Sequence, residues 1–554
     1  MLDTSAFEAC LSHLTPSQRR AAIAELLPEE SSHAERVSAV EAVLCGPLGK
    51  FLRETMARWI VDELVPVEKL VPKPYLNWRP PVRDAMVFVV SHLSPARLAP
   101  KLVEQLELSE TTPSEERLLR LIAKVPGLQK LGQVIARNRH LSPVLRNALA
   151  SLENGIRDSK AEEIIAIIKK ELGQRLKKYS VEIAPTIVSE ASVAAVIRFT
   201  WREPGSKQRQ RGVFKVLKPH IPAFFAEDLD YLHGLTQYFR ERHHRYGFPA
   251  RLIPDTFRKV QRLLGNEVDF VREQRTLSEA SNLYSGIVGV RVPRVIQPLC
   301  TRTITALSEE RGVKVPNATA RMSHEQRRKV AQQLIEALVA VPLLTANEHA
   351  VFHGDPHAGN LLYNKQTGDL VILDWALRER LSREQRRHLA LLFLMVSLRD
   401  PDGTYHEILS LSQQVIRPAA RQAKVIQQTI RSFLEELAVV PLADGVEAMH
   451  LLERIALEGL KFPAPLIMLS KMMFTLDGIL HDIGGEGRAF SVAAHIVRHW
   501  ITHREAFRSP LKAQDWITLQ LSALLYVSRL WLKGEEIVVE QLLPAGTMPS
   551  IVRH

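Results

Sequence analysis

Cysteine and long apolar runs are scarce in this chain of 554 residues. The three cysteines, Cys10, Cys45 and Cys300, form no CxxC pair, so neither a disulfide framework nor a structural zinc site is expected. No run reaches the roughly 18 consecutive apolar residues that a membrane-spanning helix needs. The opening segment carries Asp3 and Glu8 and lacks the basic start of a signal peptide. We therefore predict a cytoplasmic protein.

Acidic residues are outnumbered by basic ones. Lys and Arg number 73 against 61 Asp and Glu, which gives a formal net charge of +12. This excess suits anionic partners such as nucleotides, phospholipid head groups or nucleic acid. The basic residues are dispersed and not interleaved with aromatic ones, so we predict no nucleic-acid partner. The length predicts two to four structural units.

The strongest chemical signal is the segment from His353 to Asn360 (HGDPHAGN), followed by an apolar run that ends in Asp374. An acid, an Asn five residues later and a second acid after a short hairpin suit phosphoryl transfer, which depends on positioning and charge neutralisation. We predict that Asp355 orients the attacking hydroxyl or water. The Asn360 amide oxygen and the Asp374 carboxylate are hard ligands, and we predict that they bind Mg²⁺.

Two histidines flank Asp355 in this segment. The spacing of His353 and His357 also occurs in metal sites, but Pro356 and Gly359 disfavour the helix that would align the two rings. We therefore predict that His353 serves the catalytic site by bracing its loop. The alternative, that these residues are only turn signals in an unrelated helical protein, is disfavoured by the joint spacing of the acids, the Asn and the His.

Phosphoryl transfer also needs a cation on the phosphates, and Lys215 is the candidate. It lies in the apolar run 213–217 (VFKVL), where a lysine is costly to bury unless it is paired. A later helical pattern carries Glu267 and Glu273, which are six residues apart and so lie well apart around a helix axis. Kinase chemistry pairs one such glutamate with the strand lysine. A solvated, charged helix face is the alternative interpretation of this run.

Together these residues resemble the UbiB/AarF family of atypical protein-kinase-like proteins, which is associated with ubiquinone and isoprenoid lipid metabolism. The matching motifs are, in order, KxGQ at Lys130–Gln133, ExD at Glu267–Asp269 and HxDPxxxN at His353–Asn360. They follow the family's order over about residues 115–480. Jointly they are highly specific.

The resemblance implies an ATP site with Mg²⁺ in which Lys215 pairs with Glu273. It places the nucleotide loop at Ala191, Ser192 and Val193. Aminoglycoside and choline phosphotransferases share the HGD…N…LDW pattern. Nothing in those two families requires the KxGQ and ExD motifs, so a small-molecule kinase of that kind is the second interpretation.

The resemblance also implies a lid. Lys130 and Gln133 would belong to a family-specific helical extension that folds over the place where a peptide substrate would otherwise dock. Glu267 and Asp269 would meet this extension or the metal site. A lid of this kind would leave room only for a small acceptor.

Three features depart from the family pattern. The nucleotide loop usually reads close to AAAS, whereas this chain has Glu190 within SEAS. An acid beside phosphates would repel them, so we expect Glu190 to point away. Ala376 replaces the glycine that follows the metal-binding acid, and the C-terminal pair of membrane spans of some bacterial members is missing. These departures keep a third interpretation open, a nucleotide-binding pseudokinase that acts as a lipid-handling scaffold.

The acceptor is expected to be small or lipid-like for a second reason. Ser382 to Gln385 (SREQ) forms a capping box that starts a helix, so only residues 375–381 separate Asp374 from that helix. Seven residues are too few for the activation segment that presents a peptide platform in regulated protein kinases.

The whole pattern predicts an α+β, two-lobed protein-kinase-like fold with a large all-helical N-terminal extension and a helical C-terminal tail. β-branched runs at 181–188, 193–201 and 212–217 mark the strand-rich lobe, and helical spacing predominates after residue 323. The predicted segments are 1–112 (helical domain), 113–180 (KxGQ extension), 181–310 (N-lobe), 311–480 (C-lobe) and 481–554 (tail).

Two apolar stretches in the C-terminal half bear on membrane contact. Residues 389–398 (LALLFLMVSL) are too short to span a bilayer and predict a buried core helix. Residues 516–531 predict an amphipathic helix that packs on the body or, alternatively, lies on a membrane surface. The second alternative would give a peripheral contact at the inner face of the membrane.

Overall fold

The computed structural model describes residues 31–71, 73–129, 159–247, 252–345, 347–413, 419–437, 445–484 and 510–532. The chain forms two compact units. The first comprises Met1–Phe270 and Ile296–Leu307, and the second comprises Val271–Val295 and Ser308–His554.

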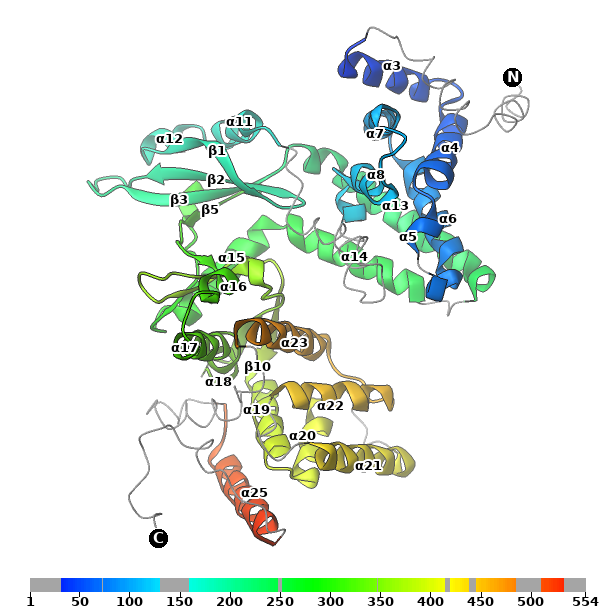
Figure 1. The fold of residues 1–554 in the computed structure, drawn as a ribbon. Coiled ribbons are helices and arrows are strands. Elements are labelled where there is room, and N and C mark those ends of the chain that lie inside the picture. Colours follow the sequence, from blue (N-terminus) through cyan, green and yellow to red (C-terminus); the bar gives the residue numbers. More distant parts are fainter. Residues whose placement is uncertain are drawn as a thin grey trace. The chain divides into compact units, whose positions relative to one another are not determined.

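The first unit contains a helical layer that packs on two long helices from later in the chain (Figure 1). The helices of the layer are α3 (His33–Cys45), α4 (Gly49–Trp59), α5 (Val67–Leu70), α6 (Arg79–His92), α7 (Pro95–Glu107) and α8 (Ser114–Ile122). The two long helices are α13 (His220–Arg242) and α14 (Leu252–Val268). A buried ion pair from Arg97 Nη1 to Asp228 Oδ1, 2.6 Å long, joins α7 to α13.

The first unit also contains an antiparallel sheet in the order β1-β2-β3-β5. Its strands are β1 (Glu182–Glu190), β2 (Ala194–Trp201), β3 (Gln210–Leu217) and β5 (Ile304–Ser308). Alternate side chains of β2 and β3, such as Ile197, Phe199 and Phe214, are buried against α11 (Ala161–Leu172). This alternation is the period of two that a half-buried strand requires.

The second unit carries two small sheets at the start of a helical lobe. The pair β7 (His349–His353) and β10 (Arg378–Ser382) is antiparallel. The other sheet has the order β4-β9-β8-β6, with β4 (Val290–Arg291), β9 (Leu370–Ile372), β8 (Leu361–Tyr363) and β6 (Val313–Lys314). Together the two sheets set the backbone positions on both sides of the HGDPHAGN segment.

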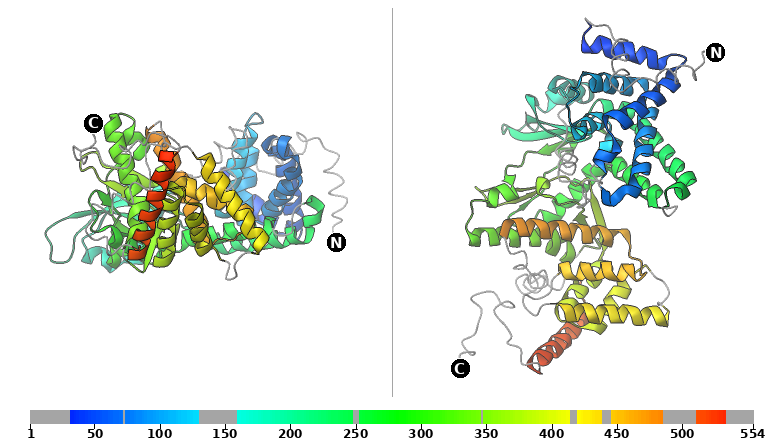
Figure 2. Two further views of the ribbon diagram at one scale, coloured as in Figure 1. Left: turned by 90° about the horizontal axis from the view of Figure 1, so that it is seen from below. Right: turned by 45° about the vertical axis from the view of Figure 1, so that its right-hand side comes forward.

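The helices of this lobe include a run, α19 to α23, in which each packs on the next along the chain, with α21 and α22 side by side (Figure 2). The helices of the lobe are α15 (Phe270–Tyr284, from Val271 on), α16 (Val315–Thr319), α17 (His324–Ile335), α18 (Val341–Leu344), α19 (Arg383–Ser397), α20 (Pro401–Leu411), α21 (Ala420–Glu436), α22 (Gly445–Leu457), α23 (Ala464–Gly484) and α25 (Ala513–Leu532). The segment 389–396 of α19 is buried, which confirms the predicted core helix.

The helical pattern that carries Glu267 and Glu273 is interrupted, so the two residues lie on different helices and not on one as predicted. Helix α14 ends at Val268 and α15 begins at Phe270, with Asp269 between them. Asp is favoured just before a helix because its short side chain can accept bonds from the first-turn amides. The apolar periodicity on both sides of Asp269 conceals this boundary in the sequence.

The capping box predicted at Ser382 is confirmed. The Ser382 hydroxyl accepts from the Gln385 amide and the Gln385 side chain accepts from the Ser382 amide, so helix α19 begins there. The preceding residues, from Arg378, form strand β10, which leaves only a short turn after Asp374.

Helix α25 packs on the second unit through polar contacts. Asp515 pairs with Arg387 of α19, and the Ser522 hydroxyl donates to Asp400 at 2.8 Å. The opposite face exposes four large apolar side chains, Ile517, Leu521, Leu524 and Leu525. Among the helices of the described ranges, none has the length and apolar character that crossing a membrane requires.

Candidate functional site

Just after strand β7, the backbone of the HGDPHAGN segment passes close to the backbone of Leu377. The Gly354 amide donates to the Leu377 carbonyl at 2.9 Å. A side chain at Gly354 would lie 3.1 Å from that carbonyl, so the position favours glycine. The turn therefore sets the direction in which the chain runs into Asp355.

His353 is buried, with 2% of its surface exposed, and it bonds to two backbone segments. Its Nε2 donates to the Leu373 carbonyl at 2.9 Å, and its Nδ1 accepts from the Asp355 amide at 3.2 Å. Only a neutral imidazole protonated at Nε2 makes both bonds. Burial lowers the pKa of His353, consistent with that neutral form.

Strand pairing places Asn360 next to Asp374. In the β8–β9 ladder Leu361 pairs with Ile372, and one step further the Leu373 amide donates to the Asn360 carbonyl at 2.8 Å. The Asn360 side-chain amide donates to the Asp355 carbonyl at 3.3 Å. This bond uses the amide nitrogen and not the oxygen, which is the atom predicted to bind a cation.

Asp374 is exposed and has a φ of +52°, a left-handed conformation that is strained for a residue other than glycine. The next residue anchors it: Trp375 is fully buried and its indole N–H donates to the Ile372 carbonyl at 3.3 Å. The Trp375 ring also meets the His353 ring edge-on, with centroids 5.0 Å apart. The strained backbone angle therefore belongs to the residue whose carboxylate is predicted to bind metal.

Lys471 is a site residue that the sequence reasoning missed. It lies on α23, and its Nζ is 3.0 Å from the Asp355 Oδ1. The two residues are separated by 116 positions, so no local motif joins them. The available signal was a lone lysine in the apolar run LIMLSKMMF.

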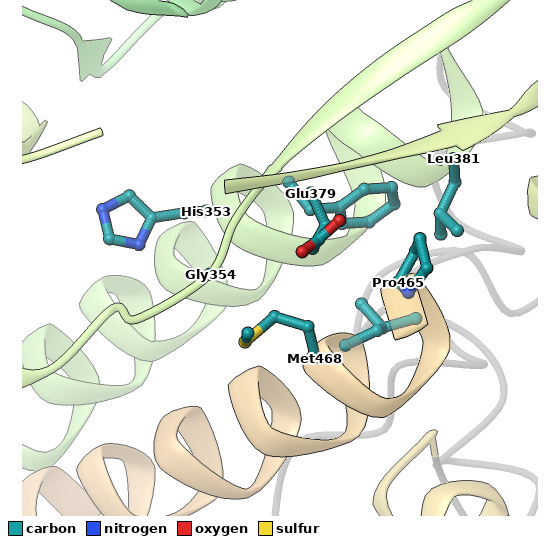
Figure 3. A pocket seen from close by; sticks show the side chains of 8 residues that line it. His353, Gly354, Glu379, Leu381, Pro465 and Met468 are labelled. Carbon is teal, nitrogen blue, oxygen red and sulfur yellow. The ribbon is translucent and has the colours of Figure 1, made fainter. Parts of the chain in front are cut away.

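The second unit has a small pocket between the end of β7, strand β10 and the start of α23. Figure 3 shows Pro465 and Met468 of α23 facing Glu379 and Leu381 of β10. The other lining residues are Phe352, His353, Gly354 and Leu469. Most of these side chains are apolar, and the pocket reaches the backbone that leads into Asp355.

The first unit contains the residues predicted to hold the nucleotide. Lys215 on β3 is half-buried, and its Nζ lies 5.5 Å from the centroid of the Phe270 ring. Between β1 and β2, the Ala191 amide donates to the Ala194 carbonyl at 2.8 Å, while Val193 is buried. The turn between β1 and β2 is thus closed by a backbone hydrogen bond, and its role as the nucleotide loop stays a prediction.

The predicted nucleotide loop contacts the ExD motif within this unit. The Ser192 hydroxyl donates to Glu267 Oε2 at 3.2 Å. Glu267 is half-buried near the end of α14, and Asp269 is exposed. The structure thus brings Ser192 and Glu267 together, a contact that the motifs did not predict.

Glu190 is buried in an ion pair. Its Oε2 lies 3.0 Å from the Nζ of Lys218, and the exposed fractions of the two side chains are 4% and 1%. The same oxygen accepts from the Ser159 amide at 3.3 Å. The negative charge that departs from the family pattern is therefore compensated inside the first unit.

The remaining predicted residues are distributed as follows. Glu273 is buried on the part of α15 that belongs to the second unit, whereas Lys215 belongs to the first. Their pairing stays a prediction. Lys130 and Gln133 lie outside the described residues, so the lid also stays a prediction.

The sheet-bearing first unit, the helical lobe and the ordered motifs define an atypical kinase-like protein. The profile of the ABC1 atypical kinase-like domain matches residues 151–407. Residues 151–407, a little under half of the chain, are therefore similar to the ABC1 atypical kinase-like domain. The predicted α+β kinase-like fold with a helical N-terminal region is confirmed.

Several relatives are similar over much of the chain. The uncharacterized protein sll1770 of Synechocystis sp. is 24% identical over 368 residues, which are 65% of this chain and 60% of the relative. A probable protein kinase UbiB of Glaesserella parasuis is 22% identical over 69% of each chain. The corresponding UbiB of Haemophilus ducreyi is 21% identical over 69% of this chain and 70% of its own.

A solved structure of Rv3197 with erythromycin, from Mycobacterium tuberculosis, aligns with a TM-score of 0.43 at 15% identity. The alignment covers 65% of this chain and 87% of that chain.

The buried pair at Glu190 gives a stability prediction. Lys218→Met leaves a buried carboxylate without its cation, so we expect the free energy of unfolding to fall by about 3–5 kcal/mol in denaturant titrations. Adding Glu190→Gln should recover most of the loss. Lys169→Met, at an exposed position of α11, is the control. A Lys218→Met chain as stable as this control would contradict the buried pair.

Proposed function

We propose that the chain binds ATP with Mg²⁺ and either hydrolyses it or transfers its γ-phosphoryl group to a small or lipid-like acceptor. The observation that carries this proposal is the arrangement around one loop of the second unit. Strand pairing brings Asn360 to Asp374, and the same loop holds Asp355. Two oxygen ligands beside a carboxylate are the groups that phosphoryl transfer requires.

Each side chain has a proposed role. Asn360 and Asp374 would hold the metal ion, which neutralises charge on the phosphates when it is bound. Asp355 would orient the attacking hydroxyl or water and accept its proton. Lys215 would bind phosphate oxygens, with Glu273 as its predicted partner and the turn at 191–193 beneath the nucleotide.

The segment after Asp374 favours a small acceptor. Only a short turn separates Asp374 from β10, and this turn has too few residues for a peptide platform. The relatives named UbiB and the family resemblance make an isoprenoid or quinone lipid the acceptor class that we favour. The exposed apolar face of α25 would suit a peripheral contact at the inner membrane face.

The pseudokinase alternative predicts nucleotide binding without turnover. Glu190 no longer supports the pseudokinase alternative, because its negative charge is paired with Lys218. Sustained ATP consumption by purified chain would support the enzyme. Binding without consumption would support the scaffold.

The metal assignment is tested by ligand-induced stabilisation. Saturation at 100 times Kd stabilises a folded protein by about 2.7 kcal/mol, which appears as a rise in melting temperature. We expect Asp374→Asn to lose the Mg²⁺-dependent part of the rise with ATP. Asp482→Asn, at an exposed position of α23, should keep it. An unchanged rise in Asp374→Asn would refute the assignment.

The base assignment is tested by turnover. Asp355 is proposed to act on the nucleophile, so Asp355→Asn should reduce kcat by about 10²–10⁴-fold while the melting shift with Mg-ATP persists. The measurement is ATP consumption in preparations shown to be free of contaminating ATPases. Full activity in the variant would mean that another group is the base.

The lid is tested at its predicted lysine. If the extension with Lys130 folds over the site and meets the acids of the ExD motif, Lys130→Ala should change nucleotide affinity or turnover, because a lid controls access and excludes water. Lys169→Ala, on an exposed helix face, is the matched control. Identical ATP affinity and kcat in both variants would count against the lid.

A further inference from the structure

The candidate catalytic loop supplies no cation of its own. Between His353 and Asn360 there is neither lysine nor arginine. His353 is neutral because its two nitrogens serve two backbone bonds, and the His357 Nδ1 accepts from the Gly359 amide at 3.0 Å. A phosphoryl-transfer site gains from fixed positive charge near the reacting atoms. Any such charge beside Asp355 must come from another element.

Helix α23 provides it. Lys471 is the only lysine or arginine in the segment 464–484, and its Nζ lies 3.0 Å from Asp355 Oδ1. The helix is held by its apolar side chains, since Leu466, Met472 and Leu476 on the same helix are buried. The position of the Lys471 backbone is therefore fixed by the core of the second unit.

Stability alone gives little reason for this lysine. The Lys471 side chain is 35% exposed and that of Asp355 is 14% exposed. Ion pairs of that exposure contribute little to folding, and a long side chain loses conformational freedom when it is held in one geometry. This ion pair contributes little to folding stability, yet it is formed with the carboxylate of the candidate base. Its position therefore points to a functional role.

We propose that Lys471 is a positioning residue for Asp355, a role that rests on the proposed function. In the transfer, the acceptor oxygen bonds to the γ-phosphorus, the bond to the β,γ-bridging oxygen breaks with ADP leaving, and the acceptor proton passes to Asp355. Lys471 fixes the orientation of the carboxylate that receives the proton. It also supplies positive charge that the loop lacks.

The test compares Lys471→Met and Lys471→Arg with Lys461→Met, an exposed lysine outside α23. We expect kcat of Lys471→Met to fall by about 10- to 100-fold, the range that misplacement of a catalytic group produces. KM for Mg-ATP and the melting shift with Mg-ATP should stay as in the unsubstituted chain. Lys471→Arg should recover most of kcat, because it restores a cation that can reach the carboxylate. Lys471→Gln is a second uncharged variant if Lys471→Met folds poorly.

The outcomes separate the two proposals. If the unsubstituted chain consumes ATP and Lys471→Met is as fast as Lys461→Met, the role of Lys471 is wrong and the proposed function stands. A faster Lys471→Met would also overturn the role, because the lysine would then be masking Asp355. If the unsubstituted chain binds nucleotide without turnover, the proposed function fails and the positioning role fails with it.

Discussion

The bonds of one buried imidazole determine the geometry of the candidate site. His353 donates to the carbonyl just before Asp374 and accepts from the amide of Asp355. These two bonds tie the end of β7 to the segment that follows β9, so the candidate base and a candidate metal ligand are held by a single ring. Burial keeps the ring neutral, and neutrality is what allows one nitrogen to donate while the other accepts.

Two charges near the predicted chemistry have ion-pair partners outside their own element. Glu190 pairs with Lys218, and Asp355 pairs with Lys471. The first pair is almost fully buried, where a lone charge would be very costly. The second is partly exposed to solvent, where the cost of removing the two charges from water is smaller.

The features of the site that depend on short-range sequence patterns could be predicted from the sequence. The spacing from Asp355 to Asn360 and the apolar run before Asp374 located the loop, and the capping box located the start of α19. The sequence did not predict Lys471, because a contact across 116 residues depends on how α23 packs. It also did not predict the helix boundary at Asp269, since the apolar periodicity continues on both sides.

The strained backbone at Asp374 is supported by the residue that follows it. A left-handed φ at Asp374 is sustained only if neighbouring contacts determine it more strongly than the strain opposes it. Trp375 provides those contacts, because it is fully buried, bonds to the Ile372 carbonyl and packs against His353 and Tyr284. A glycine in the motif would give backbone freedom. In this chain a buried aromatic side chain next to Asp374 holds the strained backbone in place.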